Sequence, residues 1–410
     1  RDRSPSRGLG DVYKRQMNSS SIFRKFRNVG YTLPESLAEL ADNSITHNAK
    51  NIWIYMYWAD DSGKDSFVMV VDDGDGMDEK TLLEKALTLP KEDHIDQGDH
   101  DLSMFGLGLK TGSFQHCTSI TAITKKNNTL TKKTLNFNKV TDEMPSCINH
   151  KFIQKHLKAF EQQKSGTVII WSDLDNISKL RASDRPSNFY TDYDNARLHF
   201  KLTYHKYLLE KDVNIFFGGG EDINKTRSFD PFYKKDNETI KLENVEISFQ
   251  NGGTTILKPW IIPQDTQIEK LGRNKNDLQG LYFFRKKRLI HSGGWFGISE
   301  KDTEKYWGST DKFNRLRIEI ELPEENPKDW MSSFSKNKIA IPDYAKNRIR
   351  KHLNQIRKDY LEKIGEMRED RKEPISEELQ KKKELIRMIN NTNLSKEEMQ
   401  KIEASLKDMK

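Results

Sequence analysis

The chain has 410 residues, of which 34% are hydrophobic and 32% are charged, so it is long enough for two or three domains of ~100–200 residues with packed cores. No run of ~18 apolar residues occurs, which argues against a membrane span and favours a cytoplasmic protein. Its two cysteines, Cys117 and Cys147, stand outside any Cys/His metal spacing, so we expect two reduced thiols and no zinc site.

The net charge of +7 is unevenly distributed. Residues 1–16 carry five basic and two acidic side chains and lack the apolar stretch of a signal peptide. We therefore interpret Met17 as the natural start and 1–16 as an extraneous segment. Residues 345–410 carry 18 basic and 13 acidic side chains, which leaves 17–344 with a net charge of −1. Only the tail is basic, so the high pI alone does not indicate nucleic-acid binding.

The N-terminal half is expected to combine helices and strands. A helix is predicted over 33–48, because Pro34 suits a first turn and Leu37, Leu40 and Ala41 recur at helical spacing. The elements expected after it are strands at 51–58 and 66–72, a helix from Asp78 to about Leu87, a polar loop at 89–105, a short helix near 108–115, and strands near 117–124, 130–137 and 166–173.

The C-terminal half is expected to be rich in strands. The elements expected there are a helix at 189–210, a break at 218–220, strands at 240–249, 254–262, 279–285 and 315–322, a helix from about 343 that ends before Pro374, and a last short helix capped by Ser395. The helix from 343 carries an apolar stripe that suits docking or a coiled coil.

Glu39 and Asn43 are four residues apart in the first predicted helix, so they share one face. A carboxylate there could take a proton from a water that attacks a γ-phosphate, and a carboxamide oxygen could bind Mg²⁺. The alternative is a solvated helix face.

An acidic glycine turn, Val71-Asp72-Asp73-Gly74-Asp75-Gly76-Met77, directly follows an apolar strand. A carboxylate at a strand end can accept a hydrogen bond from an adenine amino group, and glycines let backbone pass close to a flat ring. An acidic turn without a ligand is the alternative. A calcium loop of the EF-hand type is excluded, because no Glu stands at its last ligand position.

A second glycine-rich turn, Phe105-Gly106-Leu107-Gly108-Leu109-Lys110, opens the helix near 108–115. Backbone N–H groups at a helix start bind anions, and Lys110 would add a positive charge for phosphate. The pattern is neither a Walker A loop nor a Rossmann turn.

In order, Glu39–Asn43, Asp72–Gly76, Gly106–Gly108 and Gly166-Thr167 resemble the four boxes of the gyrase/heat-shock-chaperone/histidine-kinase/MutL (GHKL) ATPases. The resemblance implies an α+β protein: a Bergerat-type ATP-binding α/β sandwich in 17–212, a transducer like domain 2 of ribosomal protein S5 in 213–345, and a charged helical tail in 346–410. It implies ATP and Mg²⁺ as cofactors and a slow ATPase. By it, Glu39 is the general base and Asn43 the Mg²⁺ ligand.

The remaining roles also come from the resemblance. Asp72 reads adenine, with Gly74, Gly76 and Met77 beside it, and Thr167 helps hold Asp72 and a water. Residues 89–112 form the ATP lid. The sequence FGLGLKTGS and the segments 197–208 and 280–290 resemble the MORC branch, where a lysine of the second domain reaches the γ-phosphate. Lys336 is the expected lysine and Lys338 the alternative.

On this interpretation ATP binding would dimerise the N-terminal regions into a clamp that acts on DNA or a partner protein, with no membrane involved. A nucleotide-gated binding module, in which the tail and residues 285–288 contact phosphates, stays open, as does a MutL-like repair ATPase. A defence component acting with a nuclease rests on analogy alone. A histidine kinase is rejected, because no histidine stands between Met17 and Leu37.

Overall fold

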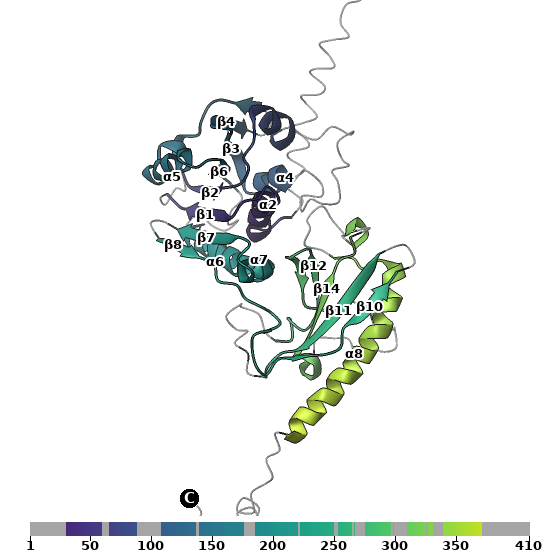
Figure 1. The fold of residues 1–410 in the computed structure, drawn as a ribbon. Coiled ribbons are helices and arrows are strands. Elements are labelled where there is room, and N and C mark those ends of the chain that lie inside the picture. The colour runs from purple at the N-terminus through teal and green to yellow at the C-terminus, as the bar shows by residue number, and fades with distance from the viewer. Residues whose placement is uncertain are drawn as a thin grey trace, which may run out of the picture. The chain divides into compact units, whose positions relative to one another are not determined.

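The structure analysed is a computed structural model, and Figure 1 shows it as a ribbon. It describes residues 30–59, 65–87, 108–136, 139–175, 185–219, 222–249, 253–264, 266, 275–296, 298, 310–324, 327–330 and 339–370. Several predicted features lie outside these residues: the loop at 89–105, the start of the second glycine turn at 105–107, Lys336, Lys338, and the last helix.

The first layer is an eight-stranded sheet in the order β5-β4-β3-β6-β2-β1-β7-β8 (Figure 1). Its strands are β1 (Asn51–Tyr57), β2 (Phe67–Asp72), β3 (Cys117–Lys126), β4 (Thr129–Asn136), β5 (Lys139–Thr141), β6 (Gly166–Leu174), β7 (Asn214–Gly219) and β8 (Asp222–Lys225). All neighbours are antiparallel except β1 and β7, which are parallel. The mixed α/β architecture that the sequence predicts is therefore confirmed.

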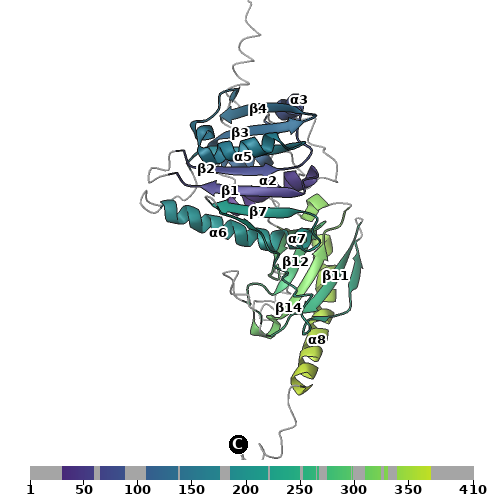
Figure 2. The same cartoon turned by 60° about the vertical axis from the view of Figure 1, so that its left-hand side comes forward.

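Helices cover both faces of this sheet. They are α2 (Leu33–Thr46), α4 (Gly108–Phe114) and α6 (Arg185–Thr203) on one face, and α5 (Lys151–Glu161) on the other. Figure 2 shows α5 in front of the strands and α2 behind them. Side chains alternate accordingly along the strands. Ile54 and Val70 pack in the core under α2, whereas Tyr55 and Met69 pack under α5.

A second, six-stranded sheet follows in the order β10-β11-β14-β12-β13, with β9 paired to β11. Its strands are β9 (Ile240–Lys241), β10 (Val245–Ser248), β11 (Thr254–Ile261), β12 (Gly280–Arg285), β13 (Arg288–Ser292) and β14 (Leu316–Glu321). Phe232, Tyr282, Phe284 and Leu289 form a core cluster here with Leu202 of α6. One helix thus contributes side chains to the cores of both sheets.

The boundary between the sheets falls later in the chain than predicted. The sequence prediction starts the second domain at residue 213, but β7 pairs with β1 and β8 pairs with β7 in the first sheet. Ile215 and Phe217 are buried in the core of that sheet. Gly218, predicted to lie in a break, is a strand residue opposite Tyr55. Long-range strand pairing therefore overrides the glycine signal.

Three local predictions also need correction. Helix α5 was missed, although Ile153, Leu157 and Phe160 recur at helical spacing and are buried. The strand predicted at 279–285 is β12, but the chain then turns at Lys286, which has a φ of +54°, into β13, a strand that the sequence analysis missed. The predicted helix at 189–210 is two helices, α6 and α7 (His205–Leu209), which meet at Tyr204.

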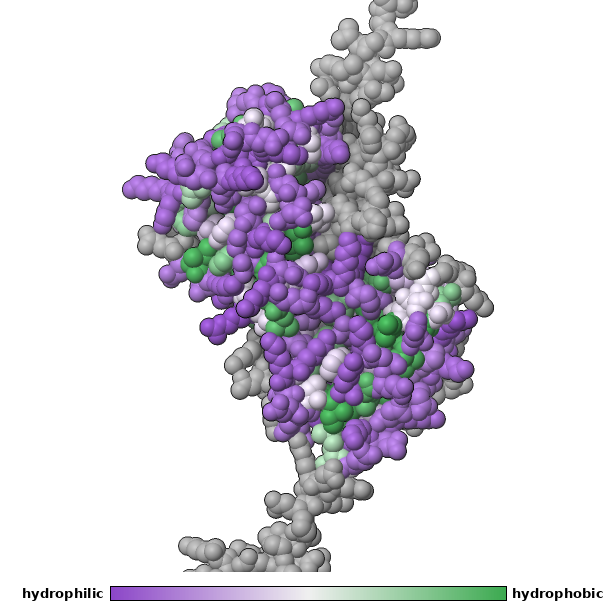
Figure 3. All heavy atoms as spheres, viewed as in Figure 1, coloured by the Kyte–Doolittle hydropathy of each residue, from purple (hydrophilic) through white to green (hydrophobic). Residues whose placement is uncertain are grey.

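Short helices complete the described secondary structure. They are α3 (Glu79–Thr81), which Asp78 caps as predicted, a π-helix (Leu82–Ala86), and 3₁₀ turns at Ser146–Asn149, Asp311–Phe313 and Pro327–Trp330. Both cysteines are buried, and no disulfide joins them. Figure 3 shows a mostly hydrophilic face, and within the described part no helix is long and apolar enough to cross a membrane.

The helix predicted from about residue 343 is α8 (Asp343–Asp370). Contacts divide the chain after Arg350, so residues up to 350 form one compact unit and residues from 351 another. Both sheets lie in the first unit. The sequence analysis places the start of the tail at residue 346, whereas the contacts place it at residue 351.

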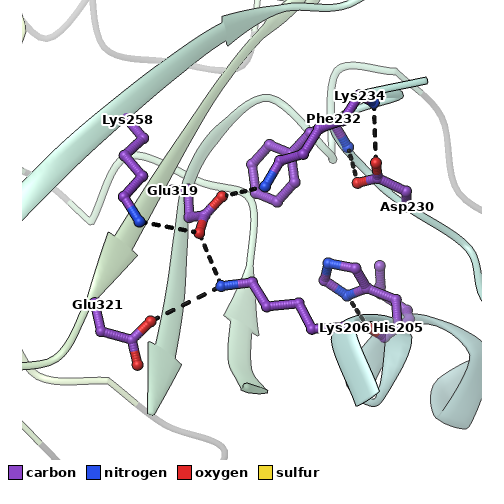
Figure 4. Close-up of polar contacts among 9 residues, drawn as sticks. His205, Lys206, Asp230, Phe232, Lys234, Lys258, Glu319 and Glu321 are labelled. Carbon is purple, nitrogen blue, oxygen red and sulfur yellow. Dashed lines mark hydrogen bonds and ion pairs between the residues drawn. The ribbon is translucent and has the colours of Figure 1, made fainter. Parts of the chain in front are cut away.

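A buried glutamate joins helix α7 to the second sheet (Figure 4). Glu319 of β14 is only 4% exposed, and its carboxylate oxygens lie 2.8 Å from Lys206 Nζ and 2.7 Å from Lys234 Nζ. Lys258 Nζ lies 3.7 Å away. Burial alone would raise the pKa of Glu319, but the two nearer ammonium groups lower it to about 2. The carboxylate is therefore ionised wherever the protein is folded under ordinary conditions.

We predict that Glu319 stabilises the fold above its unfolded pKa of ~4.3 and that this contribution is lost as the pH falls towards 2. Glu319→Gln should lower the free energy of unfolding at pH 7 by roughly 3 kcal/mol, because Lys206 and Lys234 would then face a neutral amide instead of a carboxylate. Urea unfolding of the natural protein and the variant at pH 7 and pH 3 measures the loss of unfolding free energy at each pH. Glu246→Gln, an exposed carboxylate of β10, is the control. An equal loss at both pH values would contradict the prediction.

Candidate functional site

Helix α2 carries the first group of candidate residues. Its start is fixed by a capping box between Thr32 and Glu35, whose carboxylate accepts the Thr32 N–H at 2.8 Å. Glu39 is 2% exposed and Asn43 is half-buried one turn later. Both project from a helix whose apolar side packs on the sheet, so the backbone that positions them is rigid.

Asp72 ends β2 and is held by three donors. Its Oδ1 accepts the backbone N–H groups of Gly74 at 2.9 Å and Thr167 at 3.2 Å, and its Oδ2 accepts the Ser44 hydroxyl at 2.9 Å. Burial raises the pKa of Asp72 to about 6, and the three hydrogen bonds oppose this rise. Because Ser44 belongs to α2, the carboxylate is bonded directly to the helix of Glu39.

The glycines after Asp72 allow a close backbone crossing. A Cβ atom on Gly74 would lie 2.6 Å from the carbonyl oxygen of His47, which is too close for any side chain. Gly76 has a φ of +65°, and a Cβ there would overlap the carbonyl of Lys125. The turn therefore requires glycine at both positions.

Thr124 of β3 joins this turn to β6. Its hydroxyl accepts the Met77 N–H at 2.7 Å and donates to the Gly166 carbonyl at 3.1 Å. The Thr167 hydroxyl lies 3.4 Å from the Thr124 hydroxyl. Met77 and Thr167, both predicted site residues, are thus connected through a threonine that the sequence analysis missed.

Gly108 opens α4 against Glu39. A Cβ atom on Gly108 would overlap the Glu39 Oε2 atom, so the absence of a side chain makes room for the carboxylate. Leu109 is half-buried beside it. This contact brings the second glycine turn next to the predicted general base.

Lys110 points away from solvent. It is fully buried, and its ammonium donates to the Lys85 carbonyl at 3.1 Å. Burial lowers the pKa of Lys110 to about 8. A phosphate contact by this lysine stays a prediction, as do the roles of Phe105, Gly106, Leu107 and Lys336, which lie outside the described residues.

The hypothesis that residues 285–288 contact nucleic-acid phosphates is wrong for its two arginines. Arg285 is 5% exposed and Arg288 is fully buried, where its Nε donates to Asp42 Oδ1 at 2.8 Å. Lys287 is paired with Asp212 at 2.6 Å. Three of the four basic side chains are therefore buried or paired within the chain.

Comparison with known proteins agrees with the four boxes. Residues 31–167 match the family described as histidine kinase-, DNA gyrase B-, and HSP90-like ATPase. This segment is therefore similar to the GHKL ATPase domains, and it is called the ATPase domain below. It contains the predicted residues of α2, the Asp72 turn and α4, and it ends at Thr167, which bonds Asp72.

The fold of the chain around this ATPase domain is also found elsewhere. A solved structure described as the N-terminal domain of a DNA repair protein matches with a TM-score of 0.52 and 16% identity. The match covers 83% of this chain and 98% of the other, so it extends well beyond the ATPase domain. No curated protein matches the sequence.

The bonding of Asp72 predicts base selectivity for the ATPase domain. A buried carboxylate left opposite a base without an amino group costs about 1–3 kcal/mol, so ITP should bind about tenfold to hundredfold more weakly than ATP. The preference should shrink below pH 6, as Asp72 becomes protonated. Calorimetric titration with both nucleotides measures this. Asp72→Asn should lose the preference and Asp75→Asn, an exposed neighbour, should keep it. Equal affinities at pH 8 would contradict the role of Asp72.

The Gly108–Glu39 contact predicts a second effect. Gly108→Ala should displace the Glu39 carboxylate and lower the rate of phosphate release at least tenfold, while nucleotide affinity changes less. Gly112→Ala, in the same helix, is the matched control, because the nearest atom to its added Cβ would be 3.4 Å away. A steady-state phosphate assay distinguishes the two. Equal rates in both variants would contradict the role of this contact.

Proposed function

We propose that this chain binds Mg-ATP and hydrolyses it slowly, and that ATP binding dimerises it into a clamp of the MORC-like branch. The observation that carries the proposal is the direct bonding of Asp72 to helix α2, which places an adenine-reading carboxylate and Glu39 on one support. The six-stranded sheet after the ATPase domain fits a transducer like domain 2 of ribosomal protein S5.

The residues fit a nucleotide and its metal. The Asp72 carboxylate keeps acceptor capacity beyond the donors it bonds, and Gly108 has no side chain that would displace the Glu39 carboxylate. Mg²⁺ prefers oxygen ligands and is usually bound by one or two protein groups plus phosphates. Asn43 is the oxygen donor for it on the exposed side of α2.

Hydrolysis needs a base beside the γ-phosphate. Glu39 would accept a proton from the attacking water as the water oxygen bonds to the γ-phosphorus. The bond from that phosphorus to the β-phosphate oxygen then breaks, which leaves ADP and inorganic phosphate. Glu39 is 2% exposed, so bulk water has little access to it. We propose Lys336 as the lysine that contacts the γ-phosphate, with Lys338 as the alternative.

The clamp acts on DNA or on a partner protein. The solved structure that matches 83% of the chain comes from a DNA repair protein, which favours DNA. A MutL-like repair ATPase, in which hydrolysis only resets the clamp, is the second candidate. DNA retention with hydrolysis blocked distinguishes the two candidates, since a MutL-like repair clamp should then retain DNA.

The first test combines size and turnover. With the non-hydrolysable analogue AMPPNP and Mg²⁺, light scattering should show a dimer. Glu39→Gln should keep this dimer but lower phosphate release about 10²–10⁴-fold, because general-base catalysis contributes that much. Glu84→Gln, an exposed carboxylate in the π-helix, is the control. A monomer with AMPPNP would overturn the clamp, and unchanged turnover in Glu39→Gln would overturn the mechanism.

A further inference from the structure

A buried ion pair connects the ATPase helix α2 to the second sheet. Arg288 opens β13, and its Nε lies 2.8 Å from Asp42 Oδ1 and 2.7 Å from Oδ2. The side chain of Arg288 is 1% exposed and that of Asp42 is 0% exposed. The two residues are 246 positions apart in the chain.

Tyr204 completes the cluster from the junction of α6 and α7. Its hydroxyl lies 2.8 Å from Asp42 Oδ1 and 2.9 Å from the Ala38 carbonyl. Asp42 and Ala38 flank one turn of α2, and Glu39 lies between them in that same turn. Arg288 of the second sheet and Tyr204 at the junction of α6 and α7 therefore both contact α2 at the turn that carries the proposed general base.

The cluster is poorly arranged for stability alone. The Nη1 and Nη2 atoms of Arg288 are buried and have no hydrogen-bond partner in the described part of the structure. Burying unused donors costs free energy, and a buried ion pair is often no more stable than apolar side chains of the same size. The role of the pair is therefore geometric, since an ion pair fixes one relative placement of two elements.

Arg288 also places a positive charge beside the carboxylates of α2. Burial alone would lower its pKa, but the Asp42 carboxylate, helped by Glu39 and the Tyr204 hydroxyl, raises it above its usual value. The guanidinium is thus always ionised, and its field reaches Glu39.

We propose that Arg288 is a positioning residue for ATP hydrolysis: through Asp42 it fixes the turn of α2 that carries Glu39 to the second sheet. The inference rests on the proposed ATPase function and deepens it. Arg288 touches no reacting atom in this account. It makes the rate of the chemical step depend on where the second sheet lies. Two of the three donors to Asp72, the backbone N–H groups of Gly74 and Thr167, lie outside α2, so nucleotide affinity should depend on Arg288 less than the rate does.

Arg288→Ala and Arg288→Lys test this. Both should lower kcat for phosphate release at least tenfold, with KM for ATP and the affinity for AMPPNP changed less than threefold. A purely structural defect would instead lower the thermal midpoint and nucleotide affinity together. Arg288→Lys keeps the positive charge but loses the planar fork, so it serves if Arg288→Ala does not fold. Guanidinium added to Arg288→Ala should restore part of kcat.

Lys287→Ala is the matched control, because its partners are Glu210 and Asp212 rather than α2. Asp42→Asn should reproduce the Arg288 defect, and the double variant should be little worse than either single one. Unchanged kcat in folded Arg288→Lys and Arg288→Ala would overturn the inference. If Glu39→Gln still abolishes turnover in that case, the proposed function stands and only the role of Arg288 fails.

Discussion

The carboxylate of Asp72 must be hydrogen-bonded, because a buried charged group without partners costs more free energy than a fold can supply. Its three donors come from three places: the turn that follows it, the start of β6 and helix α2. Satisfying one side chain therefore fixes the spacing of the sheet, the glycine turn and the helix. The other features of the site, including the place of Glu39, follow from that spacing.

Glycine has a specific part in this arrangement. Gly74 and Gly76 let two backbone segments cross where any Cβ atom would collide with a carbonyl oxygen. Gly108 leaves room for a carboxylate from another helix. In each case the requirement comes from a neighbour that is distant in sequence. At each of these positions, the place of the neighbouring atom therefore excludes any residue other than glycine.

Much of the ATPase domain could be predicted from the sequence, because its signals are local. The α2 periodicity, the apolar strands and the box order identified Glu39, Asn43 and Asp72, and the structure places all three on or beside α2. Helix α5 carried an equally clear spacing and was overlooked. In contrast, nothing local distinguishes Arg288 in a run of basic residues from a solvated lysine, because its partner lies on the first helix.

The parallel pairing of β1 with β7 has a consequence for how the ATPase domain can be cut. A fragment that ends at residue 212 would retain every nucleotide box but would lose β7 and β8. Strand β1 would then be an edge, and Ile54 and Tyr55 would lie beside an unpaired row of backbone groups. Such edges recruit other chains. A fragment that keeps β1, β7 and β8 paired must therefore extend to Lys225, about sixty residues past the last recognisable motif.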